Sequence, residues 1–220
     1  PQQIRSTFEG WNQGRLQSFL IEITSHIVGA RDPDGDGPLV DQVLDVAGQK
    51  GTGRWTAISA IEQGVPLSTI TAAVDARALS ARKALRVQAA QVLGDATGAV
   101  ELDEADLEAA LYAAKLMSYT QGFALLREAS EARDYQTDLG AVSRIWKAGC
   151  IIRAVFLDRV YDAYQRDPGL QLLALDPTFA AELKAAAPRW RKVVAAAVNA
   201  GIPVPALSAS LAWYDSIRLG

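Results

Sequence analysis

The chain has 220 residues and a formal net charge of −3; half of its residues are hydrophobic and 21% are charged. This balance is that of a soluble globular protein, and the interleaved acidic and basic residues exclude the basic surface that nucleic acid requires. No apolar stretch reaches the roughly 20 residues of a membrane-spanning helix. Because Cys150 is the only cysteine, no internal disulfide forms, and we expect a cytoplasmic protein without nucleic-acid or membrane partners.

The apolar residues recur with a helical period along most of the chain. In residues 16–27 they fall at i, i+3, i+4, i+7 and i+11, which places them on one face of a helix. Residues 101–132 predict a longer helix with acidic residues in its first turns, where the helix dipole favours them. Asp176 and Pro177 predict the start of a further helix, as its N-cap and its first residue. A last helix is predicted over residues 206–219.

No segment shows the period-two alternation of a half-buried strand, and runs of β-branched residues are short. The sequence therefore predicts an all-α domain of about ten helices. Two stretches, 19–54 and 124–150, each join an apolar helix to a turn that contains lysine and glycine. This weak repeat predicts a duplicated helical bundle whose halves are joined by the long helix near Ala110.

The strongest local signal is the turn Gln49-Lys50-Gly51-Thr52-Gly53, which precedes an apolar helix. Glycines before a helix let backbone N–H groups converge on an anion, the helix N-terminus adds positive potential, and Lys50 adds a full charge. Thr52 either caps the helix or donates to a phosphate oxygen. The spacing is not that of a P-loop, and no strand precedes it, as a dinucleotide-binding fingerprint requires. From spacing alone, a plain turn with a surface lysine is an equally good interpretation.

Arg77 lies in a mainly apolar helical stretch, residues 74–79. An arginine in such a place commonly pairs with a neighbour such as Asp75 or with a helix end. It is also suited to bind a phosphate through two parallel hydrogen bonds. The residues alone favour the first interpretation.

Three further features are interpreted as structural. The acidic run 32–37 imitates a calcium loop, but the twelfth position is Val43 where such a loop needs glutamate, so we expect an ordinary turn. His26 is the only histidine and lies on the polar side of its helix, without a second metal ligand or triad partner near it in the sequence. Cys150 is interpreted as a small buried residue rather than a nucleophile.

Several blocks of the sequence resemble the helical domain of 6-phosphogluconate dehydrogenases. They follow the family's order with matching gaps and span almost the whole chain: 8–12, 18–24, 45–56, 62–66, 119–123, 145–153 and 203–207. One departure is Arg54, where the family usually has lysine, and it preserves the charge. The resemblance implies the C-terminal domain over residues 1–220, mostly helical, with a duplicated bundle and an extensive homodimer interface.

The resemblance also implies a function and a set of site residues. The function is the oxidative decarboxylation of 6-phosphogluconate to ribulose 5-phosphate with reduction of NADP, and no metal is involved. The family's contacts to the sugar phosphate fall on Lys50, Thr52 and Arg77. A residue near the cofactor and substrate falls on Val142. The chain is therefore expected to bind substrate and to dimerise.

The resemblance implies that parts of the family's enzyme lie outside this chain. The family's nucleotide-binding motif and its catalytic lysine and glutamate precede the region that resembles this chain, and a tail that completes the partner's active site follows it. We therefore expect a fragment without catalytic residues and without activity by itself. Two other hypotheses are a helical dimerisation or scaffold module without catalysis, which would not need Lys50 and Arg77, and a related β-hydroxyacid dehydrogenase, which would leave that pair unexplained.

Overall fold

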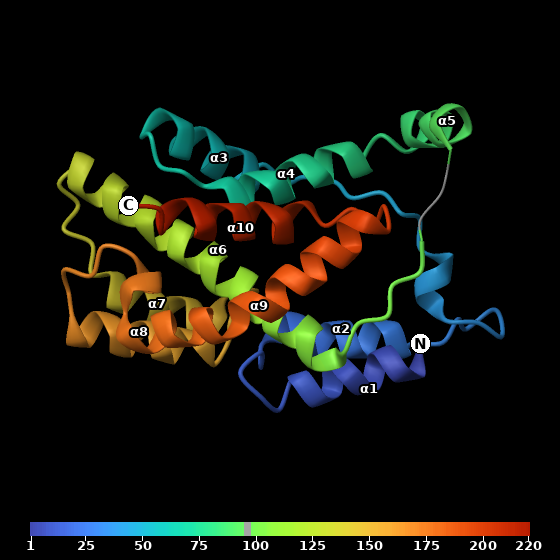
Figure 1. The fold of residues 1–220 in the computed structure, drawn as a ribbon, viewed down its shortest axis with the longest axis horizontal. Coiled ribbons are helices and arrows are strands. Elements are labelled where there is room, and N and C mark those ends of the chain that lie inside the picture. Colours follow the sequence, from blue (N-terminus) through green and yellow to red (C-terminus); the bar gives the residue numbers. More distant parts are fainter. Residues whose placement is uncertain (95–97) are drawn as a thin grey trace. The chain divides into compact units, whose positions relative to one another are not determined.

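The computed structural model describes residues 1–94 and 98–220. These residues form α-helices, short 3-10 helices and isolated β-bridges, and none of them forms a strand (Figure 1). The elements in chain order are α1 (Gln2–Trp11), α2 (Phe19–Gly29), η1 (Leu39–Gln42), α3 (Thr52–Glu62), α4 (Ser68–Ser80), α5 (Lys83–Leu93), α6 (Glu104–Ala132), α7 (Leu139–Gly149), α8 (Phe156–Arg166), η2 (Leu173–Leu175), α9 (Pro177–Asn199) and α10 (Pro205–Ile217). The predicted all-α class is therefore confirmed.

The helices are divided between two compact units, and each unit is assembled from two separate stretches of chain. Unit 1 consists of residues 1–44 and 137–170, and unit 2 consists of residues 45–136 and 171–220. The division does not follow the first and second halves of the sequence, and the long helix α6 lies wholly within unit 2. Duplication of a bundle stays a prediction.

Unit 1 pairs α1 with α2 and α7 with α8. Its two stretches meet where the backbone of Ser18 forms an antiparallel bridge with that of Ala154. The Phe19 N–H donates to the Arg153 carbonyl at 3.1 Å beside this bridge. Ser18 is also the N-cap of α2, since its hydroxyl accepts from the Ile21 N–H at 3.4 Å.

Unit 2 is built around α6, which packs against α9, while α4 lies beside α10 (Figure 1). The start of α4 has no cap from its own sequence, and the completely buried Gln121 of α6 supplies one. The Gln121 side chain accepts from the Thr69 N–H and donates to the Thr69 hydroxyl, both at 2.9 Å. A buried amide pays a large desolvation penalty unless it is hydrogen-bonded, so this pairing fixes α4 on α6.

The predicted helix boundaries are close to those observed. α9 begins at Pro177 with Asp176 as N-cap, as predicted, and the last helix begins one residue before its predicted start. The prediction was wrong at Leu16, which precedes α2, because the Ser18 cap starts that helix at Phe19. Leu16 is nevertheless buried, with 1% of its surface exposed.

Of the features that were interpreted as structural, His26 and the acidic run agree with the prediction and Cys150 does not. His26 is exposed on α2, as predicted. The acidic run closes as a turn in which the Asp34 N–H donates to the Asp32 carboxylate at 3.0 Å. Cys150 directly follows α7 and is half-buried instead of buried, because its helix has ended and leaves it at the edge of the packing. Within residues 1–94 and 98–220, none of the helices has the length and hydropathy that crossing a membrane requires.

Candidate anion-binding site

The start of α3 is a helix N-terminus with unused hydrogen-bond donors. Gly51 is the N-cap with a φ of +101°, a conformation that glycine adopts without a steric penalty. The first intrahelical bond runs from the Trp55 N–H to the Gly51 carbonyl at 3.0 Å. The N–H groups of the three residues between them have no partner within the helix. None of the described side chains caps the helix, and its first turn holds no acidic residue. The positive end of the helix dipole is therefore available to an anion.

Close packing brings this helix start against α4. A Cβ atom added to Gly53 would lie 3.0 Å from the Val74 side chain, so glycine allows the first turn of α3 to approach α4. The Gln49 amide donates to the Val74 carbonyl at 3.1 Å. Residues 48–53, which we call the glycine turn, thus lie along the helix that carries Arg77.

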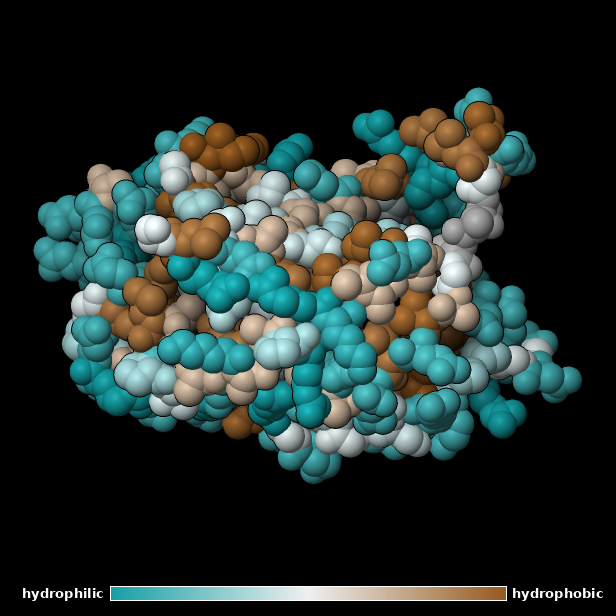
Figure 2. Space-filling view, in the orientation of Figure 1, coloured by the Kyte–Doolittle hydropathy of each residue, from teal (hydrophilic) through white to brown (hydrophobic). Residues whose placement is uncertain are grey.

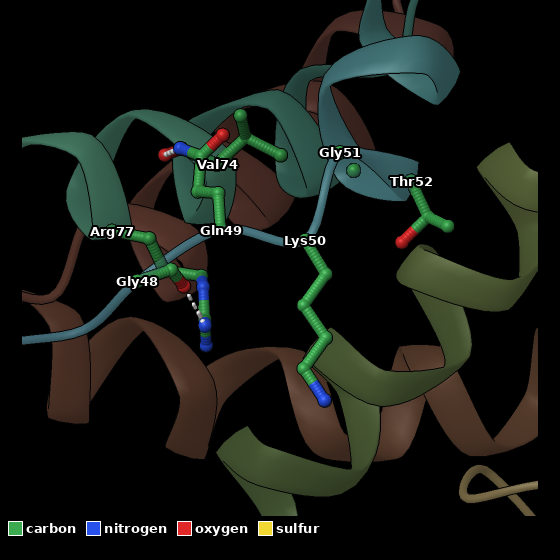
Figure 3. Close-up of a pocket in the computed structure, with 8 residues that line it drawn as sticks. Gly48, Gln49, Lys50, Gly51, Thr52, Val74 and Arg77 are labelled. Carbon is green, nitrogen blue, oxygen red and sulfur yellow. Dashed lines mark hydrogen bonds between the residues drawn. The ribbon is translucent and has the colours of Figure 1, made fainter.

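The glycine turn, Val74 and Arg77 line a cavity of about 560 Å³ (Figure 3). The Arg77 guanidinium donates one hydrogen bond to the Gly48 carbonyl, which leaves its other N–H groups for a ligand. The Lys50 side chain is exposed and has no carboxylate partner among the described residues. Figure 3 shows Lys50 and Arg77 extending toward the same side of the glycine turn, with the Thr52 hydroxyl also facing that side. Two cations and a helix N-terminus therefore converge on one cavity.

The structure brings three of the four predicted site residues together. Lys50 and Thr52 of the glycine turn and Arg77 of α4 line the same cavity. The Arg77 guanidinium binds the Gly48 carbonyl of the turn instead of Asp75 or a helix end, which were the partners that the residues alone favoured. Val142 is half-buried on α7 in unit 1, and its role near the cofactor stays a prediction.

Residues that hold the glycine turn in place were not predicted from the sequence. The Ser80 hydroxyl, one helical turn beyond Arg77, accepts from the Ala47 N–H at 3.1 Å. Asp45 receives hydrogen bonds from Lys83 and Arg86. The spacing of Ser80 from Arg77 on the same helix face was the available signal, but it does not identify the partner.

The charge on Asp45 is stabilised by these two cations. Hydrogen bonds from Lys83 and then from Arg86 lower the pKa of the Asp45 carboxyl from 3.8 to about 2. The carboxylate therefore remains ionised throughout the neutral pH range.

Comparison with known proteins identifies the family. The model of the "6-phosphogluconate dehydrogenase, C-terminal domain" matches residues 1–220. A decarboxylating 6-phosphogluconate dehydrogenase of Arabidopsis thaliana is 48% identical over 226 residues, which cover 99% of this chain and 46% of that protein. The corresponding enzyme of Treponema pallidum is 46% identical and covers 97% of this chain and 46% of its own length.

A solved structure agrees in fold. The 6-phosphogluconate dehydrogenase of Plasmodium falciparum, studied in its apo form and in complexes with its cofactor NADP+ and its substrate 6-phosphogluconate, superposes with a TM-score of 0.93 and 44% identity. The match covers 97% of this chain and 47% of that one, so the chain spans about half the length of the relatives that it matches. The chain belongs to the 6-phosphogluconate dehydrogenase family and corresponds to its C-terminal domain.

Proposed function

We propose that this chain is the substrate-binding and dimerisation domain of an oxidoreductase that decarboxylates 6-phosphogluconate to ribulose 5-phosphate and reduces NADP. Membership of the family supports the reaction, and the relative from Plasmodium falciparum binds the same substrate and cofactor. The observation that carries the role of this chain is the cavity in which Lys50, Arg77 and the start of α3 converge.

The cavity has the chemistry that a sugar phosphate requires. The Arg77 guanidinium is a planar fork that matches two phosphate oxygens, and Lys50 adds a mobile point charge. The Thr52 hydroxyl and the unused N–H groups of α3 add neutral donors around the same anion. Holding the phosphate in this way anchors the sugar, so that its reacting carbon is presented in one orientation for hydride transfer.

NADP supplies the hydride acceptor, and we propose that it is bound mainly outside these 220 residues. The sequence contains no G-x-G-x-x-G, and the described residues form no strand on which a dinucleotide-binding turn is built. We therefore expect the purified chain to show no reduction of NADP when 6-phosphogluconate is added. Formation of reduced nicotinamide, followed by its absorbance, would overturn this assignment of roles.

The proposal of a homodimer rests on exposed apolar side chains of unit 2. In Figure 2 hydrophobic side chains gather on α5, where Val92 and Leu93 have 76% and 83% of their surface exposed. Ile61 of α3 is similarly exposed. Exposed apolar side chains that gather in this way mark association surfaces in soluble proteins. We propose the cytoplasm as the compartment of this chain. Light scattering of the purified chain at micromolar concentration should give twice the monomer mass, and a monodisperse monomer would contradict the proposal.

The phosphate site is tested by calorimetric titration with 6-phosphogluconate and, as a matched ligand without the phosphate, gluconate. Arg77→Ala should weaken 6-phosphogluconate binding roughly 10- to 100-fold, because a hydrogen bond to a charged group contributes about 1.5–3 kcal/mol. Lys50→Ala should weaken it less, since an exposed ammonium is well solvated. Arg133→Ala removes an exposed arginine outside the cavity and should change nothing.

The alternative is a scaffold module that does not bind the substrate. Undetectable binding of 6-phosphogluconate by the wild type would favour it, whereas binding with equal affinity by the wild type and both cavity variants would place the substrate outside this cavity.

A further inference from the structure

An extended segment, residues 45–49, runs antiparallel to α4 and is held along it by side chains. Gln49 is bound to the Val74 carbonyl, Gly48 to the Arg77 guanidinium, and Ala47 to the Ser80 hydroxyl. The residues of α4 that make these contacts are spaced by three, so they lie on one face of the helix. From Gln49 to Ala47 the contacted residue moves from Val74 to Ser80, about one helical turn along α4 for each residue of the segment. We call these three contacts the ladder.

The ladder provides hydrogen-bond partners for backbone groups that lie outside helices and strands. Residues 46–50 belong to no helix or strand, and their N–H and C=O groups need other partners. The half-buried Ala47 N–H finds its acceptor on Ser80 at 3.1 Å. Loss of this hydroxyl would leave a partly buried donor without its acceptor.

Arg86 closes the far end of the ladder by binding the segment and the helix at once. One guanidinium nitrogen donates to the Asp45 carboxylate at 3.1 Å. The other donates to the Asp45 carbonyl at 2.6 Å and to the carbonyl of Ser80, the last residue of α4, at 3.1 Å. Lys83 adds a second cation to the same carboxylate. The carbonyls at the end of a helix lack intrahelical partners, so Arg86 also completes α4.

We propose that Asp45, Ser80 and Arg86 are positioning residues that hold the glycine turn beside Arg77 for phosphate binding; we call them the clamp. The inference rests on the proposed function for the identity of the ligand. None of the three residues lines the cavity, so they act on the phosphate through the backbone that they hold.

The physical reason is the entropy of the glycine turn. Gly48, Gly51 and Gly53 leave this backbone with more accessible conformations than other residues would, and ordering it on binding costs free energy. The clamp fixes one end of the turn and the α3 helix fixes the other. Lys50 and the free N–H groups of α3 are then in place before the ligand binds. This preorganisation raises affinity, because less of the backbone has to be ordered on binding.

The experiment combines hydrogen exchange of the peptides that cover residues 45–53 with titration of 6-phosphogluconate and inorganic phosphate. The whole 220-residue chain is used, with Asp45→Asn, Ser80→Ala and Arg86→Ala. In each variant the hydrogen-exchange rate of these peptides should rise more than that of other peptides. The affinities for 6-phosphogluconate and for inorganic phosphate should fall by the same factor, roughly 3- to 10-fold. Ser80→Thr keeps the hydroxyl and should restore both values.

A matched control separates the clamp from a general loss of stability. Lys147→Ala removes a similarly exposed ion pair, that with Asp158, and should change neither the exchange of residues 45–53 nor the affinity. Unchanged exchange and unchanged affinity in Asp45→Asn and Arg86→Ala would overturn the clamp. If the wild type binds neither ligand, the proposed function fails, and faster exchange in the variants alone then decides whether the clamp holds the turn.

Discussion

The helices α9 and α3 begin in opposite ways. At the start of α9 the Asp176 carboxylate, with only 2% of the residue exposed, accepts from the N–H groups of Thr178 and Phe179 at 3.0 and 3.3 Å. Pro177 occupies the first position and has no N–H to satisfy. At the start of α3 the N-cap is Gly51, which has no side chain to accept from the exposed donors.

The comparison separates a helix start that serves the fold from one that we propose binds a ligand. α9 uses its first donors internally, and this gains stability. α3 leaves them open, and the cations Lys50 and Arg77 beside them add to the positive potential that attracts an anion. An uncapped start alone indicates nothing, but an uncapped start in a cavity with two cations is typical of a phosphate site.

Replacing the N-cap glycine of α3 is expected to have the largest effect. Gly51→Ala places a side chain at a φ of +101°, which costs about 1–3 kcal/mol, and distorts the turn so that 6-phosphogluconate affinity falls as well. Urea unfolding and calorimetry measure the two effects. Gly10→Ala, near the end of α1 with open space at its Cβ position, is the control and should not lower stability.

Removing the cap of α9 should lower stability without touching the site. Asp176→Ala is expected to cost about 1–2 kcal/mol because two N–H groups lose their acceptor. Affinity for 6-phosphogluconate should be unchanged, and Asp176→Asn, which retains an acceptor oxygen, should recover most of the stability. A loss of affinity in Asp176→Ala would mean that the two helix starts are not independent.

Giving α3 an acidic first residue should produce opposite changes in stability and affinity. In Thr52→Glu the new carboxylate interacts with the helix dipole and should stabilise the chain by about 0.3–1 kcal/mol. The same charge occupies the position of the phosphate and should abolish binding. Thr52→Gln is the neutral control for both measurements. A glutamate that stabilises the helix and leaves binding intact would place the anion elsewhere.

The smallest expected effect is a pH dependence from the exposed Asp45. Its pKa in the folded chain, about 2, lies below the ordinary value of 3.8, because Lys83 and Arg86 hydrogen-bond its carboxylate. A lowered folded-state pKa contributes stability that is present above about pH 4 and is lost as the pH falls toward about 2. The difference in unfolding free energy between wild type and Asp45→Asn should therefore be constant near neutral pH and shrink below about pH 4. A difference that persists undiminished at about pH 2 would contradict the ion pairs.

Features that depend on residues close together in the sequence were predicted, and contacts between residues far apart in the sequence were not. Helical periodicity and the Asp176-Pro177 start of α9 are local signals, and both were confirmed. The glycine turn was singled out because glycine and lysine before a helix suit an anion, but the spacing alone left a plain turn equally good, and only the resemblance to the family favoured a phosphate site. The bond from Arg77 to the Gly48 carbonyl was not predictable, since it spans 29 positions and exists only because residues 45–49 lie along α4. The same holds for Ser80.

The discontinuous units have a consequence for synthesis. The polypeptide crosses between the units after residues 44, 136 and 170, and α4 packs against α10 near the far end of the chain. Lys50 and Arg77 are therefore synthesised well before α10, the helix on which α4 packs. Contacts of such high sequence separation slow folding, because a long stretch of chain must be ordered before they form. A nascent chain that stalls before α10 would carry Lys50 and Arg77 without the helix on which α4 packs.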